Sequence, residues 1–212
     1  HEIFFNSDQM NKKAANYWLE TVPKMVSKNF LFKFNKNNKI ESSDIEPIFI
    51  FGVPRSGTTL IETIITSGKE KIYNAGENIV LQSALQNSQL NKKIQESEKS
   101  ITFDISFLKK NIIKSYKKQL SLKSEKFKFI DRTMSNFFFS EILLEIFPNA
   151  KIINCKRDNF HNLVAIYQQC LNNLPWSHKV EDIKKYISFY NYKLSNLGKN
   201  YSKNILNVEL KK

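Results

Sequence analysis

Residues 47–60 read Pro-Ile-Phe-Ile-Phe-Gly-Val-Pro-Arg-Ser-Gly-Thr-Thr-Leu, and this stretch decides the fold. Its apolar half, Ile48 to Phe51, predicts a buried strand that ends at glycine and proline. The two glycines that follow have the spacing of a phosphate-binding loop, GxxxxGK[ST]. Thr58 stands where that loop has its lysine, and the guanidinium of Arg55 lies inside the loop instead. We therefore predict an anion site that opens a helix over residues 58–66.

The backbone of such a loop can bind an anion by itself. A glycine-containing turn before a helix directs N–H groups at the anion, and the helix N-terminus adds about half a positive charge. Arg55 would add a charged fork, and Ser56, Thr58 and Thr59 would add hydroxyl donors. A nucleoside triphosphate would need the missing lysine and an acidic residue to hold magnesium. The loop therefore suits a sulfuryl group without a metal, and a turn that binds nothing is the alternative.

Strands and helices alternate along the rest of the chain. Apolar runs predict strands at residues 48–53, 127–130, 151–155 and 205–210. Helical periodicity predicts helices near residues 58–66, 79–86, 104–120, 136–147, 160–171 and 180–197. In the first of these, Leu60, Ile61, Ile64 and Ile65 share one face. This order indicates an α/β protein of the P-loop NTPase-like kind, with three α/β/α layers and a central parallel sheet.

The three arginines of the chain follow predicted strands. Arg55, Arg132 and Arg157 each lie at or just beyond a strand end. Ligands of parallel α/β sheets lie outside the carboxyl ends of the strands. We therefore expect the three guanidinium groups to converge on one anion. Pairing of the latter two with their neighbours, Asp131 and Asp158, is the alternative.

The first part of the chain carries little periodic signal. Residues 14–26 predict a helix in which Pro23 marks a kink or an end. Residues 35–44 are polar and are expected to form a connector. We predict an accessory N-terminal helical segment over residues 1–46, followed by one folded domain over residues 47–212.

Composition limits the classes of molecule that this protein is expected to bind. Lysine and arginine number 33 against 20 acidic residues, a net charge of +13. This excess favours polyanions in general, but the lysines are scattered among asparagines, so we expect a solvated surface and no nucleic-acid partner. No apolar run reaches the roughly 18 residues that span a membrane, and we expect a cytoplasmic protein. The two cysteines, Cys155 and Cys170, are expected in the core, and no metal site is expected.

Four stretches in order resemble the sulfotransferases that use 3′-phosphoadenosine-5′-phosphosulfate (PAPS) as donor. They are Pro54-Arg55-Ser56-Gly57-Thr58-Thr59-Leu60, Ala75-Gly76-Glu77, Asp131-Arg132-Thr133-Met134-Ser135-Asn136-Phe137, and the run from Phe147 to Lys156-Arg157-Asp158. The first is similar to the 5′-phosphosulfate loop in its arginine form, as in tyrosylprotein sulfotransferases and bacterial tetratricopeptide-linked sulfotransferases. The resemblance extends over residues 47–210.

This resemblance implies a function for each matching residue. Glu77 would be the base, and Arg55 and Arg132 would stabilise the transferring sulfuryl group. The acceptor would be a hydroxyl or phenol of a small molecule or a protein, protein tyrosine included. PAPS would be the co-substrate, held by Arg55, Ser56, Gly57, Thr58, Thr59, Leu60 and Arg157, the last of these on the 3′-phosphate.

The sequence also departs from the family pattern. Ala165 stands where a serine usually contacts the 3′-phosphate, and the family continues beyond Leu210, so we expect a C-terminally incomplete domain. Glu77 has an alternative role as the N-cap of a helix near Asn78. The three histidines are expected at the surface or at helix caps.

Two other functions stay open on the residues alone. One is a P-loop phosphotransferase or kinase-like nucleotide-binding protein, which the missing lysine disfavours. The other is a non-catalytic domain that binds anions or nucleic acid, which the net charge suggests.

Overall fold

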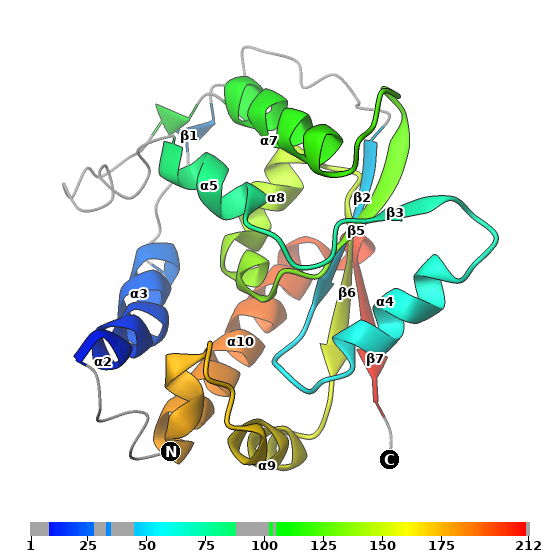
Figure 1. Cartoon of the computed structure of the whole chain (residues 1–212). Coiled ribbons are helices and arrows are strands. Elements are labelled where there is room, and N and C mark those ends of the chain that lie inside the picture. Colours follow the sequence, from blue (N-terminus) through cyan, green and yellow to red (C-terminus); the bar gives the residue numbers. More distant parts are fainter. Residues whose placement is uncertain (1–8, 28–32, 35–44, 88–101, 104, 211–212) are drawn as a thin grey trace.

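A parallel sheet of five strands forms the centre of the protein, in the order β3-β5-β2-β6-β7 (Figure 1). The computed structural model describes residues 9–27, 33–34, 45–87, 102–103 and 105–210. The strands are β2 (Ile45–Phe51), β3 (Ile72–Asn74), β5 (Phe127–Asp131), β6 (Lys151–Lys156) and β7 (Ile205–Glu209). A separate parallel pair joins β1 (Lys33–Phe34) to β4 (Thr102–Phe103). The predicted central parallel sheet is confirmed.

The central strand β2 is apolar on both faces because helices cover the sheet on both sides. Phe49, Ile50 and Phe51 are each 0% exposed. Side chains alternate along a strand, so the two phenylalanines face the main core and Ile50 faces a smaller cluster with Ile130 and Cys155. A continuous apolar run is what a strand with two covered faces requires.

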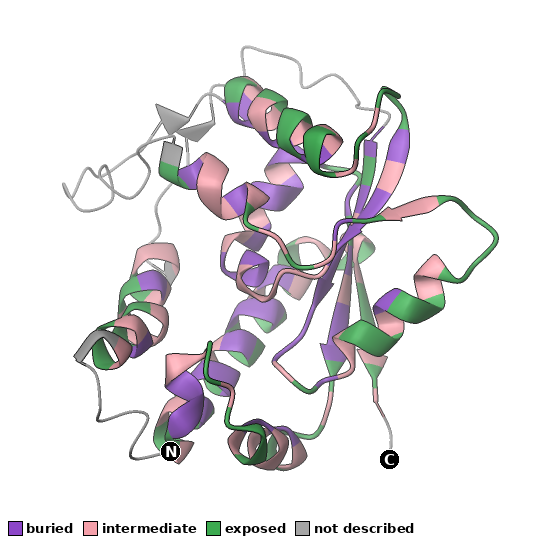
Figure 2. Cartoon of the chain, in the orientation of Figure 1, coloured by how far each residue is buried: buried purple, intermediate pink, exposed green. Residues whose placement is uncertain are grey.

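Helices lie on both sides of the sheet, as the α/β/α prediction requires (Figures 1 and 2). Helix α4 (Thr58–Thr66) covers one face. The other face carries α5 (Val80–Asn87), α7 (Ile105–Gln119), α8 (Ser140–Ile146) and α10 (Val180–Asn200). Helix α9 (Asn159–Gln169) follows β6, and short 3-10 turns occupy η2 (Met134–Phe139), η3 (Pro175–His178) and η4 (Ser202–Asn204). The helix predicted over residues 136–147 is thus divided between η2 and α8.

The described part of the N-terminal segment packs onto this domain. It consists of α2 (Gln9–Asn16), the π-helical turn η1 (Tyr17–Thr21) and α3 (Val22–Ser27). Ala15 and Val22 belong to the main core, at 1% and 0% exposed. The ring of Trp18 lies 5.5 Å from that of Phe138. The helix predicted for residues 14–26 is therefore present with a π turn before Pro23; the connector over residues 35–44 lies outside the described residues, and the domain boundary stays a prediction.

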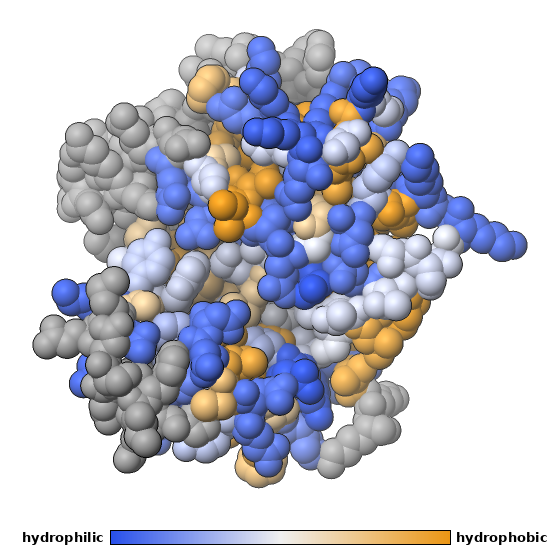
Figure 3. Space-filling view, viewed as in Figure 1, coloured by the Kyte–Doolittle hydropathy of each residue, from blue (hydrophilic) through white to orange (hydrophobic). Residues whose placement is uncertain are grey.

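The prediction that α4 buries one apolar face is confirmed for only two of its four residues. Ile61 and Ile65 pack against the smaller cluster, whereas Leu60 and Ile64 are 52% and 56% exposed. Figure 3 shows this exposure as an apolar strip over α4. The buried residue of the helix is Glu62, at 6% exposed. The helix turns an acidic side chain inward because a cation lies beneath it, as described below.

The two cysteines differ from each other. Cys155 is buried in β6 at 2% exposed, as predicted, and burial raises the pKa of its thiol to about 11. Cys170 is exposed, which corrects the expected core position. It is the C-cap of α9 and has a left-handed conformation with φ 48°.

Candidate active site

The loop between β2 and α4 is tight, and its geometry requires glycine at both of its glycine positions. A side chain at Gly52 would place a Cβ atom 2.2 Å from Ser56 Oγ and 2.6 Å from the Thr58 methyl carbon. Gly57 has φ 89°, in the left-handed region that favours glycine. Arg55 also has a positive φ, 70°, which costs a side-chain-bearing residue energy. The backbone is thus held in a compact turn directly before a helix.

This turn offers donors that lack a partner. Ser56 is 2% exposed, and within the described residues its Oγ has no hydrogen-bond partner. Buried hydroxyl groups in native structures nearly always have one. The first turn of α4 adds the unpaired N–H groups of every helix start, and Thr58 and Thr59 lie in it. The loop therefore fits a bound anion such as a phosphosulfate.

Arg157 lies against this loop. Strand β6 neighbours β2 in the sheet, so the residue after β6 reaches the loop after β2. Arg157 Nη1 donates to the carbonyl oxygen of Arg55 at 3.1 Å. The alternative, an ion pair between Arg157 and Asp158, does not form. The Asp158 carboxylate instead accepts a hydrogen bond from the His161 N–H at 3.0 Å and caps α9. This hydrogen bond lowers the pKa of Asp158.

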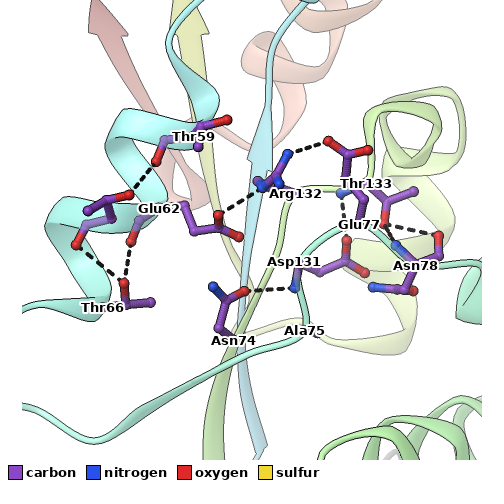
Figure 4. A network of polar contacts seen from close by, with 12 residues as sticks. Thr59, Glu62, Thr66, Asn74, Ala75, Glu77, Asn78, Asp131, Arg132 and Thr133 are labelled. Atoms are coloured by element: carbon purple, nitrogen blue, oxygen red, sulfur yellow. Dashed lines mark hydrogen bonds and ion pairs between the residues drawn. The ribbon is translucent and has the colours of Figure 1, made fainter.

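Arg132 lies between two carboxylates (Figure 4). Its Nε donates to Glu62 Oε2 at 2.8 Å, and its Nη1 pairs with Glu77 Oε1. The Glu62 side chain is 9% exposed and the Glu77 side chain 62%. Glu77 does not cap α5, because that helix begins at Val80, whose N–H donates to Asn78 Oδ1 at 2.9 Å. The N-cap interpretation of Glu77 is therefore wrong.

Strand order explains this arrangement. β5 lies between β3 and β2, so the residue after β5 is flanked by the turn after β3 and by the helix after β2. Arg132 consequently meets Glu77 from the first and Glu62 from the second. The structure thus brings Arg55 together with Arg157, and Arg132 together with Glu77. Helix α4 links the two pairs, since the loop opens it and Glu62 lies on it.

Asp131 stabilises the end of β5 instead of pairing with Arg132. It is 0% exposed and accepts hydrogen bonds from the Tyr116 hydroxyl and, at 2.7 Å, from the Thr133 N–H. Burial, followed by the nearby charge of Asp131, raises the pKa of Tyr116 well above its usual value. The alternative of a neighbouring Asp131–Arg132 pair is therefore wrong, and the guanidinium is left for the two glutamates.

The turn that carries Glu77 is hydrogen-bonded on both sides of this residue to the two residues that follow β5. Gly76 has φ 59°, and its carbonyl accepts from the Arg132 N–H at 3.0 Å. The N–H of Asn78 donates to Thr133 Oγ1 at 2.8 Å. These bonds position the backbone on either side of Glu77, so the carboxylate is placed by a rigid turn although its side chain is exposed.

Glu62 is the site residue that sequence reasoning missed. It is a single acidic residue within the apolar helix that follows the loop, and periodicity treats such a residue as solvated. The signal that could have found it is this isolation: α4 contains no other charged residue. His178 also differs from expectation, because it is buried at 3% exposed, and burial lowers its pKa.

Two cavities border the site. One of about 320 Å³ includes Glu77 and Thr133 in its lining. The other, of about 530 Å³, includes Arg157 and Val53. Among the described residues, no group of three or more His, Cys, Asp or Glu side chains could hold a metal ion. No helix in the described ranges is long and apolar enough to cross a membrane.

Known proteins resemble this chain in sequence and in fold. A protein of Aquifex aeolicus (strain VF5) described as uncharacterized is 37% identical over 131 residues, which are 58% of this chain and 17% of that protein. The sulfotransferase domain of the Synechococcus PCC 7002 olefin synthase superposes with a TM-score of 0.50 at 20% identity, covering 77% of this chain and 66% of that one. Sulfotransferase STF9 from Mycobacterium avium gives a TM-score of 0.49 at 12% identity, over 95% and 67% of the two chains.

The match spans about a sixth of the length of the Aquifex relative. At 20% identity, the likeness to the Synechococcus domain supports the fold alone. The sequence profile of the sulfotransferase family matches residues 47–208, which hold the loop, both carboxylates and all three arginines of the site. The chain belongs to the sulfotransferase family.

Proposed function

We propose that this protein transfers a sulfuryl group from PAPS to the hydroxyl or phenol of an acceptor. The observation that carries the proposal is the ion-pair chain in which Glu62 holds Arg132 and Arg132 holds Glu77. It connects an exposed carboxylate to the helix whose start forms the anion loop. A base and an anion site are thereby kept in fixed relation, which group transfer requires.

The loop side would hold the donor. PAPS supplies a sulfuryl group on a phosphate leaving group. The amides of Gly57, Thr58 and Thr59, the buried Ser56 hydroxyl and the Arg55 guanidinium would hold the phosphosulfate. Leu60 is 52% exposed on the same helix and offers apolar surface to the nucleoside. Arg157 would bind the 3′-phosphate, and the cavity it lines has room for more of the nucleotide.

The other side would hold the acceptor. Glu77 would accept the proton of the acceptor hydroxyl, and a positioned base contributes about 10²–10⁴-fold to a rate. Arg132 would stabilise the negative charge that develops on the sulfuryl group; one such donor is worth about 10²–10³ in turnover. Its bond to Glu62 keeps the guanidinium in place while Glu77 engages the acceptor.

Calorimetry with 3′-phosphoadenosine 5′-phosphate (PAP) and turnover with labelled PAPS test these roles separately. Arg55→Ala and Arg157→Ala are expected to weaken PAP binding. Glu77→Gln is expected to keep PAP binding and lose turnover. Glu70→Gln is the matched control, because its side chain is 60% exposed and pairs with Lys128 at 2.7 Å, away from Arg132. A folded protein that does not bind PAP would refute the proposal.

Two outcomes would favour other functions. A rise in melting temperature that needs magnesium and ATP together would indicate a phosphotransferase. Steeply salt-dependent polyanion binding that survives both Arg55→Ala and Glu77→Gln would indicate a non-catalytic binding domain.

A further inference from the structure

We propose that the cavity beside Glu77 is the acceptor site and that it takes a compact, uncharged phenol or aryl alcohol. The inference rests on the proposed function, because a base must contact the hydroxyl it deprotonates. Glu77 is part of the lining of this cavity, and so is Thr133, whose hydroxyl is bonded to the turn that carries Glu77. The acceptor hydroxyl would therefore lie at the Glu77 end.

The size and the walls of the cavity set the kind of molecule. Its volume of about 320 Å³ is at the small end of ligand pockets, which span about 300–1,000 Å³. Most of its wall is apolar, and the apolar residues come from five separate segments of the chain: Trp18, Ile79, Met134, Leu174 with Trp176, and Tyr186. A small molecule with an apolar body fits such a wall better than a sugar, whose hydroxyl groups would lose their hydrogen bonds to water.

Aromatic side chains form part of this wall. Trp176 and Tyr186 stack with ring centroids 3.8 Å apart and an interplanar angle of 7°, and they are 1% and 2% exposed. Rigid aromatic walls favour an aromatic ligand, through stacked or edge-to-face contact. Within the described residues the Tyr186 hydroxyl has no hydrogen-bond partner. Burial raises the pKa of this hydroxyl, so the Tyr186 ring stays neutral in the wall.

Charge excludes anionic acceptors from this cavity. Glu77 is the one charged side chain among the described residues that line it. A carboxylate on the acceptor would lose its water in a mostly apolar space where Arg132 is already paired with Glu77 and no described lining residue adds a cation. An acceptor with an ammonium group would pair with Glu77 and occupy the base. A neutral body is therefore the fitting one.

One wall comes from outside the region matched by the family. Trp18 lies on η1, whereas the family profile begins at residue 47. Its ring packs against Phe138 at 5.5 Å, which places the N-terminal segment against the domain. The segment before the family region would thus contribute to the choice of acceptor.

Tryptophan fluorescence can test this site without any turnover. The chain has 2 tryptophans, and both line the cavity. We expect para-propylphenol to quench their emission saturably and to accept labelled sulfate from PAPS. Its carboxylate analogue, para-hydroxyphenylpropanoate, is expected to bind roughly tenfold more weakly or worse, and methyl glucoside is expected not to bind.

A matched pair of variants locates the binding. Ile79→Arg puts a large cation at a lining residue that is 70% exposed, so the fold is expected to tolerate it. It should weaken para-propylphenol binding roughly tenfold or more and leave PAP binding intact. Leu206→Arg makes the same kind of change on β7 at a residue that is 59% exposed and is not in the lining, and it should alter neither.

The inference and the proposed function fail in different ways. If para-propylphenol does not bind saturably, binds equally to Ile79→Arg, or binds no better than its carboxylate analogue, the acceptor assignment is overturned. Sulfation of a sugar instead would overturn it while leaving the proposed function standing. Loss of the proposed function would appear as a folded protein that binds neither PAP nor PAPS.

Discussion

Replacing Glu62 by glutamine tests whether the ion-pair chain matters for catalysis. The substitution keeps the size of the side chain and removes its charge. In the structure, Glu62 Oε2 accepts from Arg132 Nε at 2.8 Å, and the Glu62 side chain is 9% exposed. We expect Arg132 to lose its ion pair with α4. Its guanidinium would then be paired with Glu77 alone and would be held less firmly in position.

The magnitude follows from the kind of contact. A hydrogen bond to a charged group is worth about 1.5–3 kcal/mol. The Arg132 side chain is 23% exposed, so water can replace part of the lost interaction. We therefore expect the free energy of unfolding to fall by an amount in the lower half of that range. In the transition state, where negative charge develops on the sulfuryl group, the full range applies. A loss of that size corresponds to a fall of roughly 10- to 150-fold in kcat.

The assay is kcat and KM with labelled PAPS, together with PAP calorimetry and the melting temperature. A positioning role for Glu62 predicts that kcat falls while PAP affinity stays constant. Glu141→Gln is the control, because it weakens another partly buried ion pair, to Lys193 at 2.6 Å on α8 and α10. That variant is expected to lower stability alone. A Glu62→Gln enzyme with wild-type kcat would refute the reasoning.

Three further predictions concern the loop and the core. Gly52→Ala should weaken PAP binding roughly tenfold or more in calorimetry, because its Cβ would lie 2.2 Å from Ser56 Oγ; unchanged affinity would contradict the tight loop. Tyr116→Phe should lower unfolding free energy by about 1.5–3 kcal/mol, or roughly 3–12 °C in melting temperature, by leaving the buried Asp131 carboxylate short of a donor; an unchanged melting curve would count against it. With a thiol pKa of about 11, Cys155 should be alkylated about tenfold faster per pH unit between pH 8 and 10, and a flat mass-spectrometric profile would disprove this.

Local patterns were enough for most of the elements. The loop and α4 lie where the glycine spacing predicts them. Helix α10 lies where periodicity predicts a helix, and it buries Ile183, Tyr186, Ile187 and Leu194 on one face. Periodicity works there because one face of the helix packs on the core. It failed on α4, where Glu62 turns inward and Leu60 and Ile64 stay exposed. Periodicity contains no information on the residues of other segments that lie beneath a helix.

The partners of the arginines could not be predicted from neighbours in sequence. Arg132 and Arg157 each precede or follow an aspartate, and that proximity suggested pairs that do not form. The actual partners of Arg132 are 70 and 55 positions away in the chain. Such contacts depend on the order of strands in the sheet, which short patterns do not encode.

The sequence by itself determined the glycine loop that opens α4, the parallel α/β class and the membership of the sulfotransferase family, since glycine spacing and apolar periodicity are local consequences of backbone geometry. Tertiary structure alone decided which residues meet. Because β5 lies between β3 and β2, Arg132 is placed between Glu77 and Glu62. The cavity that Glu77 shares with Trp18 and Trp176 likewise exists only once those distant segments pack together.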